Sequence, residues 1–206
     1  MTDAKARDEI CRIGASIFER GLTAGSSGNI SMRVEGGWLM TPTNASLGRL
    51  DPARLSLLGD DGRLVSGDAP TKESFLHRVM YEERHGTRAV VHLHSTHSVA
   101  VSCLTELDPH DVLPPITAYY VMRVGRLPLV PYFKPGDLAL AEAVRGFAGS
   151  HHAVLLANHG PVVAGSSLDA AVNAIEELEE TARLYLMLRG AKTRFLTPAQ
   201  VKELMA

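Results

Sequence analysis

The sequence is poor in cysteine, with only Cys11 and Cys103 among its 206 residues. Neither lies in a Cys-x-x-Cys pair, which argues against a disulfide framework and against a cysteine zinc site. We expect both to be buried thiols, as in a protein of the reducing cytosol. Residues 1–9 are charged and contain no apolar stretch, so no signal peptide is expected and a cytoplasmic location is favoured.

Long apolar runs and an excess of charge of one sign are also missing. No run approaches the roughly 20 apolar residues that a membrane helix needs. The formal net charge of −2 gives no general attraction to nucleic acid or to an anionic membrane, so any site for an anionic substrate must be local. The sequence also lacks internal repeats and long linkers, which favours a single domain over residues 1–206.

What is present is the composition of an ordinary globular domain, with 45% hydrophobic and 21% charged residues. The periodicity of the apolar residues predicts helices and strands in uneven alternation, with hairpins among them. We expect helices over residues 3–20, 71–85, 98–104, 136–147 and 168–189, and strands over residues 30–34, 38–41, 89–94, 153–157 and 161–164. This order favours an α/β fold in which helices cover the faces of a mainly antiparallel sheet.

Two histidines, His92 and His94, lie at the end of the strand expected over residues 89–94. Because side chains alternate along a strand, both imidazoles point to one face and Leu93 points to the other. Two nitrogen ligands on one face suit a divalent cation of borderline softness. A His-x-His pair alone is equally compatible with two surface histidines.

A third histidine, His159, follows the strand expected over residues 153–157 and precedes a Gly-Pro turn. A histidine at a strand end beside a sharp turn can point into a cleft shared with the first two. Three histidines leave coordination positions open for a substrate, as in a catalytic metal site. His97 is an alternative ligand, but it lies beyond the strand and out of register. The other histidines considered, which we expect to face solvent, are His85, His110, His151 and His152.

Glu73 lies at the start of the second expected helix, with His77 one turn later on the same face. An acidic residue in a first turn is favoured by the helix dipole, which would be a purely structural role. Alternatively, Glu73 is a general acid/base, or a fourth metal ligand that substrate displaces. The sequence alone leaves both alternatives open.

Three short segments could bind an anion. The loop over residues 25–29 offers backbone N–H groups and small hydroxyls, and residues 41–44 could add further donors. Lys72, beside Thr71, would supply a positive charge at a helix N-terminus, where phosphate already binds well. Each segment could equally be an ordinary turn.

Taken in order, five segments resemble the class II aldolase/adducin family. They are residues 27–31 (Ser-Gly-Asn-Ile-Ser), 41–43 (Thr-Pro-Thr), Glu73, 92–94 (His-Leu-His) and 158–160 (Asn-His-Gly). The resemblance spans roughly residues 7–190. It implies αβα layers around a central, mainly antiparallel sheet, and a homotetramer with active sites between subunits. Adducin-like members lack the metal histidines, so the presence of all three favours an enzyme.

The resemblance also implies roles for individual residues. It implies Zn²⁺ or a similar divalent metal on His92, His94 and His159, with Glu73 as metal neighbour and acid/base. The residues that it implies around a substrate phosphate are Gly28, Asn29, Thr43, Asn44, Thr71 and Lys72. A tyrosine in the corresponding region of the family reaches the site of a neighbouring subunit. Tyr119 and Tyr120 both lie there, and Tyr120 is the preferred catalytic candidate.

Residues 43–52, 92–96 and 119–125 are similar to one branch of the family, the 3-oxo-tetronate 4-phosphate decarboxylases. This similarity implies decarboxylation of a phosphorylated 3-oxo sugar acid to dihydroxyacetone phosphate and carbon dioxide, through a metal-stabilised enediolate. The alternative is a class II aldolase that cleaves a ketose 1-phosphate through the same intermediate. Aldolases of the family often have two serines before the glutamate, where this chain has Thr71-Lys72. A non-catalytic adducin-like module is a third possibility.

Overall fold

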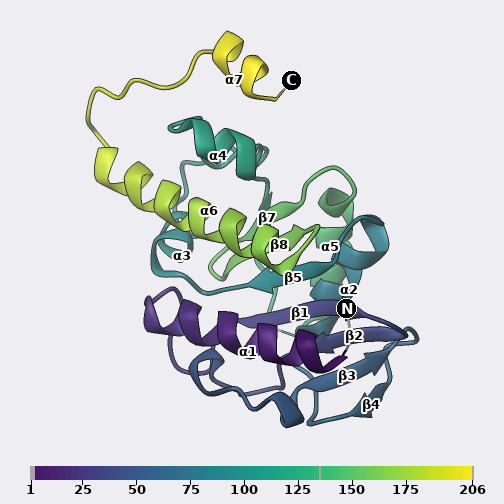
Figure 1. The fold of residues 1–206 in the computed structure, drawn as a ribbon. Helices are drawn as coiled ribbons and strands as arrows, with labels where there is room; N and C mark the ends of the chain where they lie inside the picture. Colours follow the sequence, from purple (N-terminus) through teal and green to yellow (C-terminus); the bar gives the residue numbers. More distant parts are fainter. Residues whose placement is uncertain (1–2, 135, 206) are drawn as a thin grey trace.

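The structure is a computed structural model, and it describes residues 3–134 and 136–205. Its centre is an eight-stranded sheet with the strand order β4-β3-β2-β1-β5-β8-β7-β6 (Figure 1). Neighbouring strands are antiparallel except β6 and β7, which are parallel. The strands are β1 (Asn29–Val34), β2 (Gly37–Met40), β3 (Ser56–Gly59), β4 (Leu64–Ser66), β5 (Ala89–His92), β6 (Leu129–Val130), β7 (Ala153–Leu156) and β8 (Gly160–Gly165).

Helices cover both faces of this sheet, with α1 and α6 on one face and α2 and α5 on the other. The helices are α1 (Asp3–Glu19), α2 (Ser74–Glu83), α3 (Thr96–Ser102), α4 (Ala118–Arg123), α5 (Leu138–Ala148), α6 (Leu168–Leu188) and α7 (Pro198–Leu204). None of the helices in the described ranges has the length and apolar character needed to cross a membrane. The expected α/β fold, with αβα layers around a mainly antiparallel sheet, is confirmed.

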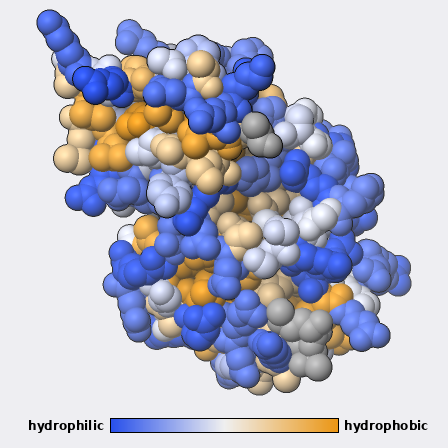
Figure 2. Space-filling view, turned by 45° about the horizontal axis from the view of Figure 1, so that its top comes forward, coloured by the Kyte–Doolittle hydropathy of each residue, from blue (hydrophilic) through white to orange (hydrophobic). Residues whose placement is uncertain are grey.

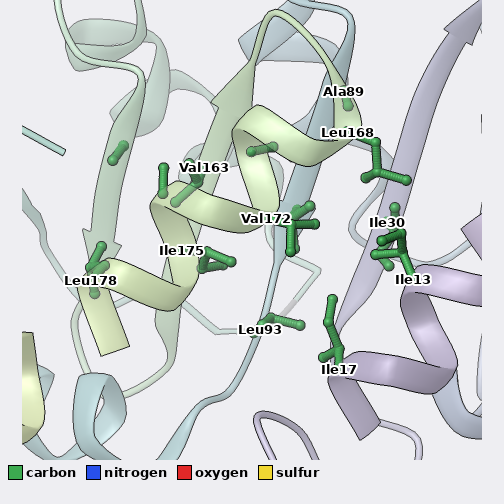
Figure 3. Close-up of a cluster of buried hydrophobic side chains, with 14 of the residues drawn as sticks. Ile13, Ile17, Ile30, Ala89, Leu93, Val163, Leu168, Val172, Ile175 and Leu178 are labelled. Atoms are coloured by element: carbon green, nitrogen blue, oxygen red, sulfur yellow. The ribbon is translucent and has the colours of Figure 1, made fainter. Parts of the chain in front are cut away.

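Two hydrophobic cores lie on the two faces of the sheet, because successive strand residues point in opposite directions. Val91 of β5 belongs to the core under α1 and α6, and its neighbour Val90 belongs to the core under α2 and α5. Figure 3 shows the first of these cores, where Ile17 of α1 and Ile175 of α6 approach the sheet. Burial on both faces fixes the sheet, so side chains at its strand ends have well-defined positions.

Some element boundaries differ from those expected from the sequence. The second helix begins at Ser74 instead of residue 71, and the backbone N–H of Thr71 is bonded to the carbonyl of Thr41 (3.3 Å). The strand expected to run to residue 94 ends at His92. The helix α7 was not expected, although Thr197 and Gln200 form a capping box that marks its start.

The expectation that both cysteines are buried is wrong for Cys103. This residue is exposed at the C-terminal end of α3, while Cys11 is half-buried in α1. Burial raises the pKa of the Cys11 thiol to about 11, so this thiol stays protonated at neutral pH. Cys11 is therefore shielded from solvent by the packing of α1, whereas Cys103 lies just beyond the end of α3 and is exposed.

Candidate metal centre

The sheet brings the three candidate histidines to one edge, because β5 and β8 are antiparallel neighbours. β5 ends at His92 where β8 begins at Gly160, so the residues just beyond β5 lie beside those just before β8. A Cβ atom on Gly160 would lie 2.3 Å from the carbonyl oxygen of Leu93. Only glycine permits this approach, and it has a φ of +149° there. The Gly-Pro turn therefore sets His159 against the end of β5.

The four candidate ligands converge on one point. The Nε2 atoms of His92 and His94 are 3.1 Å apart. The carboxylate of Glu73 places Oε1 3.1 Å from Nε2 of His159 and Oε2 3.4 Å from Nε2 of His92. One ligand atom from each of the four residues lies within 4.8 Å of all the others.

These separations fit a bound metal ion. Ligand atoms about 2.1 Å from one ion in a tetrahedral arrangement lie about 3.4 Å from one another. A hydrogen bond fixes the tautomer of the His92 imidazole, because its Nδ1 donates to the carbonyl oxygen of Pro161 (2.8 Å). The Nε2 lone pair of His92 is thereby turned toward Glu73 and His94, as a metal ligand requires. These residues could hold a divalent metal.

Burial determines the charge of the site. It lowers the pKa of the His92 imidazole to about 4 and also lowers the pKa of His94. Both are therefore neutral at neutral pH, the form that binds metals. Burial would raise the pKa of Glu73, but the neighbouring His92 and the hydrogen bonds from His159 and Asn29 outweigh it. The net effect holds the pKa of Glu73 well below its ordinary value, so it is a carboxylate.

Glu73 does not cap the helix that it precedes. It occupies the N-cap position of α2, but its side chain makes no hydrogen bond to the backbone N–H groups of that helix. The carboxylate instead contacts the two imidazoles and accepts a hydrogen bond from Nδ2 of Asn29 (2.9 Å). This geometry favours the acid/base or ligand role over the structural one.

The candidate phosphate-binding residues divide into two groups. Asn29 and Thr71 lie beside the candidate metal ligands, and Nδ2 of Asn29 also approaches Oγ1 of Thr71 (3.3 Å). Gly28 lies against them with a φ of +80°, where a Cβ would come 3.2 Å from the His92 carbonyl oxygen. Lys72 is exposed next to this group.

Thr43 and Asn44 line a separate hollow of about 230 Å³ with Arg49 and Arg54. The backbone N–H of Thr43 donates to the carbonyl of Ala69 (2.9 Å), which links this segment to the loop that precedes α2. The structure therefore brings Asn29, Thr71 and Gly28 to the candidate metal ligands, but not Thr43 or Asn44. A role for Thr43 or Asn44 in substrate binding stays a prediction.

An open hollow of about 590 Å³ gives access to the candidate ligands. It is lined by Glu73, His94, Thr96, Val99, Asn158 and His159. Its volume suits a small metabolite. The Glu73 carboxylate and two imidazoles are part of this lining, so a metal ion would supply the positive charge needed to attract an anionic substrate.

The two tyrosines are in different environments. Tyr120 is 1% exposed in the core, and its hydroxyl has no hydrogen-bond partner within residues 3–134 and 136–205. Tyr119 is 61% exposed, with the Arg123 guanidinium 5.4 Å from its ring centroid. Of these two tyrosines, Tyr119 is the exposed one, and the preference for Tyr120 as the catalytic candidate stays a prediction.

The other histidines are partly as expected. His85 and His110 are exposed, but His151 and His152 are half-buried, and Nε2 of His152 donates to the carbonyl of Arg123 (2.8 Å). His97 is excluded from the candidate ligands by a different partner: its Nδ1 lies 2.7 Å from Oε1 of Glu179. Sequence reasoning missed Glu179, since a buried acid within a long helix has no local signal.

Sequence reasoning also gave no role to His77, which is 1% exposed. Its Nε2 lies 2.5 Å from Oδ1 of Asn29, and its Nδ1 lies 2.7 Å from Oγ of Ser31. The available signal was the four-residue spacing from Glu73, which places His77 on the same face of α2 and so near the candidate metal centre.

Comparison with known proteins agrees with this geometry. Residues 8–186 match the family model described as "Class II Aldolase and Adducin N-terminal domain". The chain is 52% identical over 188 residues to a 3-oxo-tetronate 4-phosphate decarboxylase of Cupriavidus necator, covering 91% of this chain and 87% of that protein. It is 31% identical to an L-fuculose phosphate aldolase of Methanocaldococcus jannaschii, covering 90% and 96%. The crystal structure of YgbL from Klebsiella pneumoniae superposes with a TM-score of 0.96 at 51% identity, covering 99% of both chains.

Proposed function

Because the chain belongs to the class II aldolase and adducin family, we propose that it is a carbon–carbon lyase that decarboxylates 3-oxo-tetronate 4-phosphate. The products are dihydroxyacetone phosphate and carbon dioxide. The observation that carries the proposal is the convergence of three imidazoles and one carboxylate at the end of β5. Relatives about half identical to this chain, from several bacteria, bear the decarboxylase name.

The proposed cofactor is a divalent metal, with Zn²⁺ favoured by the imidazole and carboxylate donors. His92, His94 and His159 would hold it, and Glu73 would be a fourth ligand in the absence of substrate. When bound, the metal supplies positive charge beside the substrate oxygens on which negative charge develops.

The reaction needs one proton at a defined place. When the C1–C2 bond of the substrate breaks, its electron pair remains with C2 and the adjacent C3 carbonyl, and carbon dioxide leaves. C2 must then take up a proton to give dihydroxyacetone phosphate. Glu73 is the proposed acid/base for this step, since its carboxylate is free of helix capping and faces the hollow. It would take the proton from solvent water in the open hollow and pass it to C2.

The proposed binding mode separates the two anionic groups of the substrate. Lys72, together with Asn29, Thr71 and the backbone at Gly28, is assigned to the phosphate. The carboxylate should stay weakly bound, because strong binding would be lost as it becomes neutral carbon dioxide. The absence of lysine and arginine from the lining of the hollow suits this requirement among the described residues.

We further propose a cytoplasmic homotetramer in which Tyr119 reaches the site of a neighbouring subunit. The exposure of Tyr119 and Met122 on α4 supports an interface there. Figure 2 shows apolar side chains gathered in the upper left of its view, on the side where Figure 1 draws α4 and the C-terminal half of α6.

The second candidate function is cleavage of a ketose 1-phosphate by an aldolase reaction. The similarity to the Methanocaldococcus jannaschii aldolase favours it, because the same donor set would serve either leaving group. The lower identity of this relative and the Thr71-Lys72 pair make it the weaker candidate. An adducin-like module is disfavoured by the intact histidine trio.

Product analysis tests the proposal. Zinc-loaded protein should release carbon dioxide and dihydroxyacetone phosphate from 3-oxo-tetronate 4-phosphate, and little aldehyde from L-fuculose 1-phosphate. Chelator-treated protein and the His94→Ala variant serve as controls, and both should be inactive. Rapid aldehyde release without carbon dioxide would transfer the assignment to the aldolase.

A further inference from the structure

A row of polar side chains continues from Glu73 into the protein, between α2 and β1. Glu73, His77 and Tyr81 are four residues apart, so they form one stripe on α2 and its N-cap. Asn29 and Ser31 are two residues apart on one face of β1. Four helix residues rise about 6.0 Å and two strand residues about 6.7 Å, so the two stripes stay in register.

The two stripes interleave through four consecutive hydrogen bonds. Glu73 bonds to Asn29 (2.9 Å), Asn29 to His77 (2.5 Å), His77 to Ser31 (2.7 Å) and Ser31 to Tyr81 (2.9 Å). The four inner members are at most 4% exposed. At the far end, the Tyr81 ring stacks on Trp38 with centroids 5.6 Å apart. The row therefore connects the candidate metal centre to the buried stack of Tyr81 and Trp38 in the core.

The chemistry of Glu73 fixes the direction of every bond in this row. An ionised carboxylate only accepts hydrogen bonds, so Asn29 must present its NH₂ group to Glu73 and its Oδ1 to His77. His77 must then carry its proton on Nε2, and its Nδ1 accepts from the hydroxyl of Ser31. The single hydroxyl proton of Ser31 is thereby used, so Tyr81 donates to Ser31.

We propose that His77 is a positioning residue: it locks the carboxamide of Asn29 with its NH₂ group toward Glu73, and so holds the Glu73 carboxylate against His92 and His159. Without a donor at His77, the amide of Asn29 is free to turn. Its buried Oδ1 would have lost the donor that holds it, so the side chain would shift to recover one and draw its NH₂ group away from the carboxylate. The importance of this placement for turnover rests on the proposed function, whereas the placement itself does not.

The cost of burying His77 supports a role beyond packing. The side chain lies beside an apolar core, where a leucine of similar volume would avoid the cost of removing an imidazole from water. Burial, followed by the effect of His92, lowers the pKa of His77 to about 3, so it stays neutral and keeps one donor and one acceptor. A neutral imidazole supplies both in the directions that Asn29 and Ser31 require.

Two variants of His77 test the proposal. His77→Leu removes the donor, whereas His77→Gln keeps an N–H group near the position of Nε2. Loss of an outer-shell partner typically costs roughly 10–100-fold in metal affinity or activity. We expect His77→Leu to lose kcat in that range and, because Asn29 is also assigned to the phosphate, to raise KM as well. His77→Gln should recover most of both losses.

Val79→Ala is the matched control, because Val79 is a buried apolar residue of the same helix outside the row. It should lower stability without lowering kcat. A His77→Leu variant with wild-type kcat and wild-type zinc affinity would overturn the proposal. Equal losses in His77→Leu, His77→Gln and Val79→Ala would also overturn it, since they would indicate a general loss of packing.

A crystal structure of zinc-loaded His77→Leu gives a result independent of any substrate. The proposal expects the Asn29–Glu73 hydrogen bond to be broken or the carboxylate to be displaced. An unchanged Asn29–Glu73 contact would overturn it. If the wild-type protein released no carbon dioxide, the proposed function would fail, but this structural result would still decide the role of His77.

Discussion

Single residues at the candidate metal centre have roles that depend on where their hydrogen bonds go. Glu73 precedes a helix without capping it, and its carboxylate contacts His92 and His159. His97 lies close in sequence to the candidate ligands, yet it is bound to Glu179. Proximity in sequence therefore identifies candidates, and the partner of each polar atom distinguishes among them.

The first residue-scale prediction concerns Glu73. Glu73→Gln keeps the shape of the side chain but cannot carry the proton, so turnover should fall by roughly 10²–10⁴-fold. Metal analysis should still find close to one ion per chain, since three imidazoles remain. Steady-state rates of carbon dioxide release, measured with metal content on the same samples, check this. Near-normal turnover would exclude an acid/base role.

The second residue-scale prediction concerns pH. Burial lowers the pKa of His77 to about 3 and that of His92 to about 4, both below the ordinary 6.5. Between pH 6.5 and 4 the unfolded chain binds protons at these residues and the native chain does not. Stability must therefore fall as pH decreases, by at most about 1.4 kcal/mol per pH unit for each histidine.

Urea unfolding of chelator-treated protein at pH 7 and pH 5 measures this effect. The wild type should be less stable at pH 5, and His77→Leu should lose less stability between the two values because one titrating group is gone. Equal stability of the wild type at both pH values would contradict the burial argument.

At the scale of elements, the start of α3 depends on a side chain of α6. Ser95, the N-cap residue of α3, makes no side-chain capping bond. The Glu179 carboxylate instead accepts from the backbone N–H groups of His97 (2.9 Å) and Ser98 (2.8 Å) and from the Ser98 hydroxyl (2.7 Å). Since His94 lies just before α3, α6 helps to fix the segment that carries a candidate ligand.

We predict that Glu179→Ala lowers the free energy of unfolding by roughly 1–3 kcal/mol, because buried N–H groups lose their acceptor. Glu180→Ala is the control, since its side chain is 57% exposed and pairs with the exposed Arg183, so it should change stability by at most about 0.5 kcal/mol. Chemical denaturation of both variants tests this, and equal effects would show that α3 does not need this cap.

At the scale of the whole molecule, apolar side chains remain exposed on α4. Tyr119 is 61% and Met122 58% exposed on this short helix. Exposed apolar patches of this kind are typical of interfaces between proteins. A single chain therefore leaves apolar surface of α4 open, in the region where the family resemblance implies a neighbouring subunit.

We predict that light scattering gives the mass of a tetramer, and that Met122→Glu shifts it to smaller species with reduced turnover. A charge in an apolar interface is costly, which is the reason for the shift. Val65→Glu is the control, because Val65 is 65% exposed on β4 at the opposite edge of the sheet. A monomeric wild-type protein would contradict the prediction.

The sequence by itself determined the features that depend on neighbours along the chain. Period-two and period-3.6 patterns identified the long helices and the central strands, since burial of one face imposes these patterns directly. The His-x-His pair at a strand end, and a third histidine beside a Gly-Pro turn, identified the candidate ligands. The family resemblance rested on such short segments in order.

Only the tertiary structure decided which polar atoms meet. The location of Glu73 near the start of a helix was readable from the sequence, but its N-cap position and its turn toward His159 depend on the packing of α2 beside the sheet. Packing also decides that Tyr119 is exposed while Tyr120 is buried. The Glu179 cap of α3 and the row of hydrogen bonds through His77 depend on packing in the same way. These contacts join residues 44 to 86 positions apart, so no local period records them. Their geometry follows from the register of strands and helices that the whole core fixes.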